Sequence, residues 1–232
     1  MKPKQPEGVL IDYGGTLVEE VSYDPRAGNE WLLARAVSRP PDLTIDQVLD
    51  RAAKVTNDLA ARRDEFQIET PWPMLTKLIH DFFGTKFSGS TVDLELGFWK
   101  ASVKTHAMPG AVEVLEELHE RRIPTGVVSN CSFGPHVIRY ELEKYGLAEH
   151  LQFVMVSAEY AARKPNVLLF DTAAAKLGMK PQDIWFIGDR WEIDVAGAKA
   201  AGMTPVWFHA PRSEYVDQIL CVTNWADLLR YL

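Results

Sequence analysis

The sequence feature that most constrains the fold is the alternation of strand and helix patterns between Pro109 and Phe208. Short apolar runs alternate with amphipathic segments, several of which begin at a proline or end at a glycine. Strands joined by helices of this length imply right-handed crossovers and a parallel sheet that is covered on both faces. The expected strands are Pro124–Ser129, Phe153–Val156, Ile184–Ile187, Pro205–Phe208 and Ile219–Val222, and the expected helices are Pro109–Arg122, Pro135–Tyr145, Asn166–Leu177 and Asp194–Ala201. The pattern predicts an α/β fold with a doubly wound sheet.

A further strand is expected near the N-terminus, in the segment that runs from Gly8 to Val18 and reads GVLIDYGGTLV. Its apolar run is typical of a strand buried on both faces, and it ends in the carboxylate of Asp12. Ligands of open α/β sheets bind at the carboxyl ends of the strands, which is where this carboxylate would lie. Gly14 and Gly15 allow a sharp turn and a close approach to a ligand, and Thr16 adds a hydroxyl group. Alone, such a motif is usually only a turn.

Three more polar motifs follow other expected strands, in the order Ser129–Asn130, Lys164–Pro165, and Asp189 with Asp194 beyond it. Four motifs in this order resemble those of the haloacid dehalogenase superfamily, whose members are aspartate-nucleophile hydrolases and chiefly phosphatases. The resemblance extends from about Gly8 to His209 and implies a Rossmann-like core. It has one departure, at Gly14, where the phosphatases of the family carry a second aspartate.

The segment between the first strand and its crossover has a helical pattern instead of a strand pattern. Helices are expected at Glu30–Val37, Thr44–Ala61, Met74–Phe83 and Leu94–Val103, with Asp42 or Thr44 as the N-cap of the second. The resemblance implies that this segment is an inserted all-helical cap. The expected domains are a core of residues 1–17 and 108–232 and a mobile cap of residues 18–107.

The resemblance also implies a role for each motif. Asp12 would attack phosphorus and form an aspartyl phosphate, which water then cleaves. Asp12, Asp189 and the backbone carbonyl of Gly14 would hold Mg²⁺, which prefers oxygen ligands. Lys164 would neutralise the phosphoryl oxygens, and Ser129 would donate a hydrogen bond to them. Asp194 would orient a metal-bound water or Lys164. The expected substrate-binding residues are Tyr13, Gly14, Gly15, Thr16 and Asn130.

Each of these residues also has an ordinary structural interpretation. Asp189 could cap the following helix, Asp194 could be a first-turn acid, and Ser129–Asn130 could form a turn. A lysine before a proline, such as Lys164, is usually solvated.

Gly14 leaves the type of reaction open. General acid–base help from the aspartate that it replaces is worth ~10²- to 10⁴-fold in rate. The chain could be a phosphatase that takes an acid from the cap or acts on esters with good leaving groups. It could instead belong to a phosphonate-cleaving branch, which needs a cap lysine such as Lys54, Lys77 or Lys100. The third alternative is a catalytically weak protein that binds phosphorylated ligands.

The composition narrows the expected partners. The net charge of −7 gives no reason to expect nucleic acid or an anionic membrane as a partner. No apolar run approaches the roughly 18 residues of a membrane span. Cys131 and Cys221 are too few for a disulfide framework and suit the cytoplasm, and Cys131 is more plausible as a small semi-buried residue than as a nucleophile. We expect a small phosphorylated substrate, and the oligomeric state stays open.

Overall fold

A computed structural model describes residues 4–210, 214–216 and 219–232. Its central feature is a seven-stranded sheet with the strand order β10-β11-β9-β8-β1-β6-β7. The strands are β1 (Gly8–Ile11), β6 (Thr125–Ser129), β7 (Phe153–Val156), β8 (Ile184–Gly188), β9 (Thr204–Phe208), β10 (Glu214–Val216) and β11 (Ile219–Val222). Neighbouring strands are parallel except β10 and β11, which are antiparallel. The α/β fold predicted from the sequence is confirmed.

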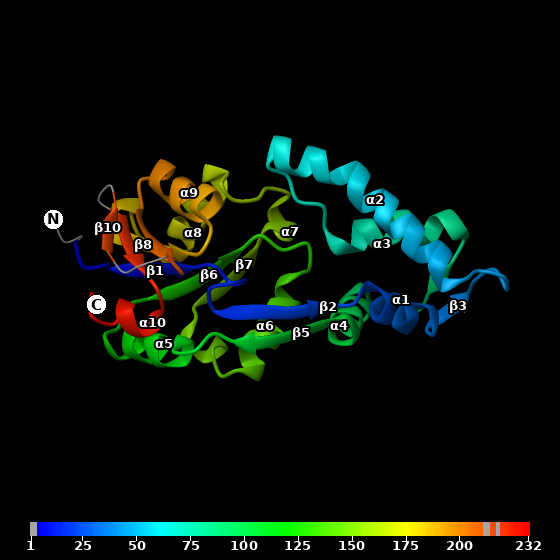
Figure 1. The fold of residues 1–232 in the computed structure, drawn as a ribbon, viewed down its shortest axis with the longest axis horizontal. Coiled ribbons are helices and arrows are strands. Elements are labelled where there is room, and N and C mark those ends of the chain that lie inside the picture. Colours follow the sequence, from blue (N-terminus) through cyan, green and yellow to red (C-terminus); the bar gives the residue numbers. More distant parts are fainter. Residues whose placement is uncertain (1–3, 211–213, 217–218) are drawn as a thin grey trace.

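Helices cover both faces of this sheet (Figure 1). The helices are α5 (Ala111–Glu120), α6 (Pro135–Lys144), α7 (Ser157–Tyr160), α8 (Val167–Leu177), α9 (Ala196–Ala200) and α10 (Trp225–Leu228), and a π-helical turn, η4 (Trp191–Val195), precedes α9. Side chains of β1 alternate between the faces, as strand geometry requires. Val9 and Ile11 pack with α5, α6 and α10, whereas Leu10 packs with α8 and α9. The strand is therefore buried on both sides.

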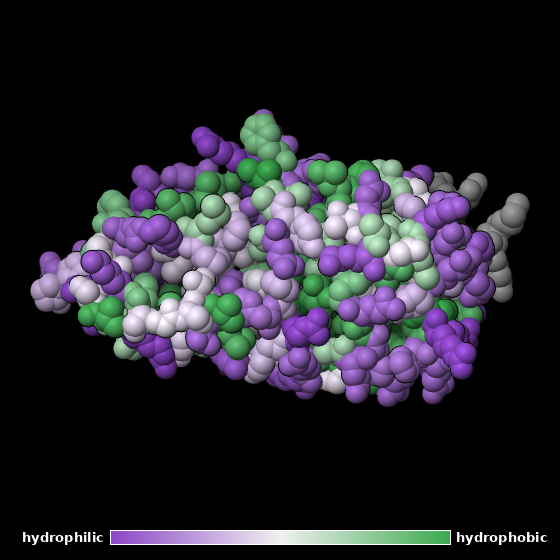
Figure 2. Space-filling view, turned by 180° about the vertical axis from the view of Figure 1, so that it is seen from behind, coloured by the Kyte–Doolittle hydropathy of each residue, from purple (hydrophilic) through white to green (hydrophobic). Residues whose placement is uncertain are grey.

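The segment between β1 and α5 contains four longer helices, α1 (Pro25–Leu33), α2 (Ile45–Phe66), α3 (Trp72–His80) and α4 (Thr91–Ser102). Thr44 is the N-cap of α2 and forms a capping box with Gln47. These helices form a separate group beside the sheet, so that the molecule is elongated in Figure 1. On the opposite face, hydrophilic and hydrophobic residues are interspersed (Figure 2).

The same segment also contains four short strands, which the helical pattern did not predict. They form two antiparallel pairs, β2 (Val18–Tyr23) with β5 (Val103–Ala107), and β3 (Ala36–Ser38) with β4 (Lys86–Phe87). Most residues of β2 are exposed, so the alternation of apolar and polar residues that marks a half-buried strand is missing. Backbone pairing between distant segments, rather than a local pattern, creates these strands.

Candidate functional site

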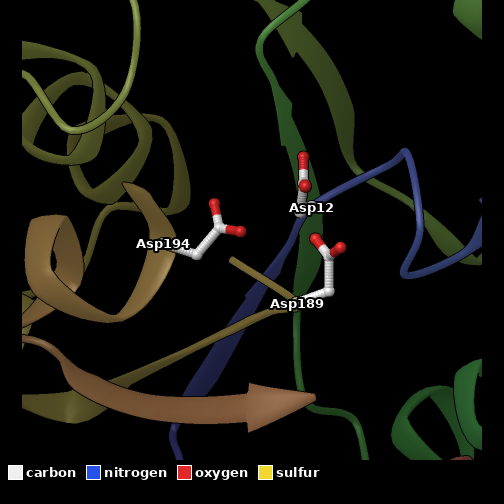
Figure 3. A group of neighbouring side chains, drawn as sticks. All are labelled: Asp12, Asp189 and Asp194. Atoms are coloured by element: carbon white, nitrogen blue, oxygen red, sulfur yellow. The ribbon is translucent and has the colours of Figure 1, made fainter. Parts of the chain in front are cut away.

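The candidate site lies at the carboxyl ends of three adjacent strands, β8, β1 and β6. Asp12 follows β1, Ser129 is the last residue of β6, and Asp189 follows β8. Parallel pairing brings these ends to the same edge of the sheet. Figure 3 shows Asp12, Asp189 and Asp194 together, although they come from three different elements.

The three carboxyl groups form one compact cluster. Each of Asp12, Asp189 and Asp194 offers a carboxylate oxygen, and these oxygens all lie within 4.8 Å of one another. Lys164 enters the cluster, where its Nζ atom lies 2.7 Å from Oδ1 of Asp12 and 2.7 Å from Oδ1 of Asp194. The lysine is 1% exposed and Asp12 is 7% exposed. Asp194 also accepts a hydrogen bond from the backbone N–H of Arg190 at 3.1 Å.

Burial and charge act in opposite directions on these groups. Burial raises the pKa of Asp12, Lys164 opposes this rise, and the neighbouring carboxylate of Asp194 adds to it. Burial lowers the pKa of Lys164, but the carboxylates of Asp12 and Asp194 outweigh burial and raise it. Burial also raises the pKa of Asp189, and Asp194 acts in the same direction. One ammonium group thus faces three carboxyl groups, which is an excess of negative charge that a cation would relieve.

The donor set of this cluster fits a metal ion that prefers oxygen. Oδ1 of Asp189 is buried and has no hydrogen-bond partner among the described residues. Gly15 has a φ of +73°, and a Cβ atom at this position would lie 2.7 Å from Oδ2 of Asp189. A side chain at position 15 would therefore displace this carboxylate. The absence of a side chain at Gly15 keeps Asp189 next to Asp12, as a shared ion would require.

A small cavity of about 120 Å³ opens beside Asp12. Of the residues predicted for the site, those that line this cavity are Asp12, Tyr13, Gly14, Ser129, Asn130 and Lys164. Gly15 contacts Asp189 instead. Thr16 does not line the cavity. Its side chain is completely buried, and its backbone carbonyl accepts a hydrogen bond from Nε1 of Trp225 at 3.0 Å.

Asn130 holds the main chain of the lysine. Its Nδ2 atom donates to the Lys164 carbonyl at 2.9 Å, and its Oδ1 atom accepts from the Lys164 amide at 2.8 Å. The side chain of Asn130 is thus engaged with the protein, and its interactions position the residue that forms the two ion pairs.

Gly14 has space around it. Its φ lies outside the left-handed region, and a Cβ atom built on it would meet no heavy atom within 4 Å. The left-handed glycine of this turn is therefore Gly15 and not Gly14. A side chain could be accommodated at position 14, where it would face the cavity.

Glu20 and Arg190 also line this cavity, and neither was among the site residues expected from the sequence. Glu20 lies on β2, which no sequence pattern predicted, so nothing placed it near Asp12. Glu20 stays exposed to solvent, but the protein groups around its carboxyl group partly desolvate it and raise its pKa, and the negative charge of Glu141 raises it further. Arg190 directly follows Asp189, and that proximity in sequence was the only signal for it.

Two other groups at the cavity hold their protons tightly. Burial raises the pKa of the Cys131 thiol far above its usual range, which argues against a thiolate nucleophile. Burial likewise raises the pKa of Tyr13. Cys131 and Cys221 are not joined in a disulfide.

Comparisons with known proteins agree with this architecture. A family described as haloacid dehalogenase-like hydrolase matches residues 92–208, which is half of the chain. A ribulose-1,5-bisphosphate 5-phosphatase of Halopiger xanaduensis is 29% identical over 126 residues, which cover 54% of this chain and 52% of the relative. A glyceraldehyde 3-phosphate phosphatase of Methanopyrus kandleri is 34% identical over 110 residues, which cover 47% of this chain and 45% of the relative. The chain thus matches about half the length of these curated relatives.

Solved structures share the fold along nearly the whole chain. A phosphatase of the same superfamily from Thermococcus onnurineus has a TM-score of 0.62 at 21% identity, with 96% of each chain covered. A 2-haloacid dehalogenase from Pseudomonas syringae pv. tomato has a TM-score of 0.59 at 16% identity, also with 96% of each chain covered. In the part of the chain that the structure describes, no helix is both long and apolar enough to cross a membrane.

Proposed function

Because the chain belongs to the haloacid dehalogenase-like hydrolases, we propose that it is a Mg²⁺-dependent phosphatase that cleaves small phosphomonoesters through an aspartyl phosphate on Asp12. The observation that carries the proposal is the ion pair between Asp12 and the buried Lys164, next to two further carboxylates and open to a cavity. The names of the relatives support a small phosphorylated metabolite as the substrate class.

Asp12 acts as the nucleophile. A carboxylate oxygen forms a bond to phosphorus, and the bond between phosphorus and the ester oxygen breaks with its electron pair on that oxygen. The leaving oxygen takes a proton and departs as an alcohol. Water then attacks phosphorus, releases inorganic phosphate and regenerates the carboxylate.

Lys164 and Ser129 bind the phosphoryl group. The ammonium group of Lys164 offsets the negative charge that attack of an anion on an anion brings together. Its pairing with Asp194 and the hydrogen bonds of Asn130 fix its position. Ser129 lines the same cavity and is placed to donate its hydroxyl proton to a phosphoryl oxygen. Tyr13 and the Gly14 backbone form another wall of the cavity.

Asp12, Asp189 and the Gly14 carbonyl would hold Mg²⁺, which supplies further neutralisation of the phosphoryl charge when it is bound. A backbone carbonyl can bind the metal whatever side chain the residue carries. Gly14 therefore keeps its place among the proposed ligands although it has no side chain. The unpartnered Oδ1 atom of Asp189 supports this assignment.

Glu20 takes the role of general acid and base that Gly14 cannot fill. Among the residues that line the cavity, it is the only carboxylic acid besides Asp12. Its raised pKa favours the protonated form that a leaving oxygen needs. The lysines that a phosphonate-cleaving mechanism would use do not line this cavity. Lys77 pairs with Asp81, and Lys100 lies over the ring of Tyr140 at 4.1 Å.

Residues 18–107 act as a cap that opens to admit substrate, and the core consists of residues 1–17 and 108–232. Cap and core meet next to the cavity, since β2 supplies Glu20 and β1 is followed by Asp12. The paucity of cysteines supports the cytoplasm as the location.

Release of inorganic phosphate from a panel of phosphorylated metabolites tests the proposal. We expect turnover that requires Mg²⁺, and we expect Asp12→Asn to abolish it while the variant stays folded. Binding of the same metabolites without phosphate release by the wild-type protein would contradict the proposed activity and indicate a binding protein.

A further inference from the structure

A second cavity, of about 320 Å³, adjoins the cavity beside Asp12. The two share Lys164, Arg190 and Ile193 in their walls. The second cavity lies between the C-terminal end of α2 and the loop that carries Lys164, and Figure 1 shows these segments next to each other. The Arg163 amide donates a hydrogen bond to the Gln67 carbonyl at 2.9 Å, so the cap and the core are in direct contact here.

Positively charged groups dominate the walls of this cavity. Arg63 comes from the cap, Arg163 and Lys164 from the loop after α7, and Arg190 from the turn after β8. The acidic residues of the lining are Asp64 and Glu192, both of which are exposed. Such an excess of cations stands out in a chain whose net charge is −7.

Arg163, which lines this cavity, is held in place by an ion pair. Arg163 Nη1 lies 3.3 Å from Oε2 of Glu69, and the Arg163 side chain is 12% exposed. The carboxylate of Glu69 is itself buried and accepts hydrogen bonds from Ser132 at 3.0 Å and Ser157 at 2.8 Å. Because its partner is anchored in this way, Arg163 is a fixed positive group and not a mobile surface side chain.

The guanidinium groups repel one another. Burial lowers the pKa of Arg163, Glu69 opposes this, and the positive charges of Arg63 and Arg190 lower it further. The side chain of Arg63 forms an ion pair with the adjacent Asp64, in which Nε lies 3.4 Å from Oδ1. Both side chains are at least one-third exposed. Such an exposed ion pair contributes little to stability. The guanidinium group of Arg63 is therefore available to bind an anion in the cavity.

We propose that this cavity binds a second anionic group of the substrate, a phosphate or a carboxylate, while the transferred phosphoryl group lies against Asp12 and Lys164. The proposal rests on the proposed phosphatase function and names its substrate class, which is phosphomonoesters that carry another anion. Arginine suits this role because its planar guanidinium group binds phosphate or carboxylate through two parallel hydrogen bonds. Arg190 contacts both cavities and lies between the two groups of such a substrate.

Matched substrate pairs test the proposal by turnover. Fructose 1,6-bisphosphate is compared with fructose 6-phosphate, and 3-phosphoglycerate with glycerol 3-phosphate, so that one pair differs by a phosphate and the other by a carboxylate. We expect kcat/KM to favour the doubly anionic member of at least one pair by ~10-fold or more. Arg63→Gln should abolish that preference, so that kcat/KM becomes about equal within the pair. Arg62→Gln, which changes the neighbouring exposed arginine, should leave the preference intact. Equal kcat/KM within both pairs, or an equal preference in the Arg63 variant, would overturn the second-anion site and leave the phosphatase proposal standing.

A binding measurement keeps the inference separate from the proposed reaction. Calorimetric titration of the four compounds into Asp12→Asn requires no turnover. The doubly anionic compound of the favoured pair should bind ~10-fold more tightly, and Arg63→Gln should remove that difference. If the wild-type protein releases no phosphate from any of these compounds, this binding result would contradict the phosphatase proposal alone. Equal affinities within both pairs would overturn the second-anion site.

Discussion

At the scale of single residues, Gly14 and Glu20 are the positions from which the proposed mechanism draws or lacks the proton for the leaving group. The two positions line the same cavity, one without a side chain and one with a carboxylic acid. Gly14 is not required by backbone strain, since its φ is not left-handed and the space around it is open. A carboxylate at either position could face the leaving oxygen.

The variant Gly14→Asp should therefore fold, and it should gain activity where Glu20 is absent. In the Glu20→Gln background the new carboxylate replaces the missing acid–base group, and we expect hydrolysis of alkyl phosphates to rise by ~10-fold or more relative to Glu20→Gln alone. Steady-state rates, with circular dichroism as the control for folding, measure this. Gly15→Ala is the contrasting variant, because its Cβ atom would collide with Asp189 and its φ is left-handed. A folded double variant whose rate equals that of Glu20→Gln would show that a carboxylate at position 14 cannot reach the leaving oxygen.

The variant Glu20→Gln should lose activity in a way that depends on the leaving group. For an alkyl phosphate, loss of the general acid should lower kcat by ~10²-fold or more. For 4-nitrophenyl phosphate the loss should be far smaller, since the nitrophenolate departs without a proton. Glu19→Gln is the matched control, because Glu19 pairs with His106 at 3.1 Å and does not line the cavity. Equal losses for both substrates would assign Glu20 a structural role.

At the scale of elements, the strands of the core could be anticipated and the strands of the cap could not. The core strands are short apolar runs such as Val9–Ile11, which are recognisable because burial on both faces leaves no polar positions. The β2–β5 pair has no such signature. Its strands are held by pairing between residues that are at least 80 positions apart in the sequence, and β2 is largely exposed. Glu20 was missed for this reason.

The site shows the same division. Asp12, Ser129 and Asp189 could be located from sequence because each lies at or directly after the end of a recognisable strand, and the family resemblance supplied Lys164. The pairing of Lys164 with both Asp12 and Asp194 could be seen only in the structure, because it joins segments that are far apart in the sequence. The same holds for the burial of Thr16, whose place in the motif had suggested contact with a ligand.

Two strands connect the cap to the core, and two further contacts join the same parts. The strands β2 and β5 form the connections, with the Met108 amide donating to the Leu17 carbonyl at 2.9 Å. One contact is made by residues 67–72, where Glu69 bonds to Ser132 and Ser157 of the core. The other joins α4 to α6, where the buried Nε1 of Trp99 donates to Glu141 at 2.8 Å. The contact of residues 67–72 is a small polar network, so it should open first.

Hydrogen exchange should therefore respond to ligand at these positions. Without ligand, amides of residues 18–21, 67–72 and 106–110 should exchange measurably, and inorganic phosphate with Mg²⁺ should slow them by holding the cap closed. Amides of β8 serve as the internal control, since this strand is buried in the sheet and should not change. Identical exchange at the joints with and without phosphate would indicate a fixed cap.

At the scale of the whole molecule, the candidate site is built from one edge of a parallel sheet and from an inserted segment beside it. The carboxyl ends of β8, β1 and β6 carry Asp189, Asp12 and Ser129, while the cap contributes Glu20 and Arg63. In the proposed mechanism the core therefore supplies the nucleophile and the phosphoryl-binding groups, and the cap supplies the general acid and part of the second-anion site. The proposed mechanism depends on Asp12 forming a bond to phosphorus.

Chemical trapping of that bond tests the account most directly. The protein is mixed with Mg²⁺ and a substrate that it turns over, quenched in acid and treated with borohydride, which reduces an acyl phosphate to an alcohol. Peptide mass spectrometry should then find homoserine at position 12, in the presence of substrate and not in its absence. Phosphate release without homoserine at position 12, or with reduction of a different carboxyl group, would contradict the assignment of Asp12 as the nucleophile.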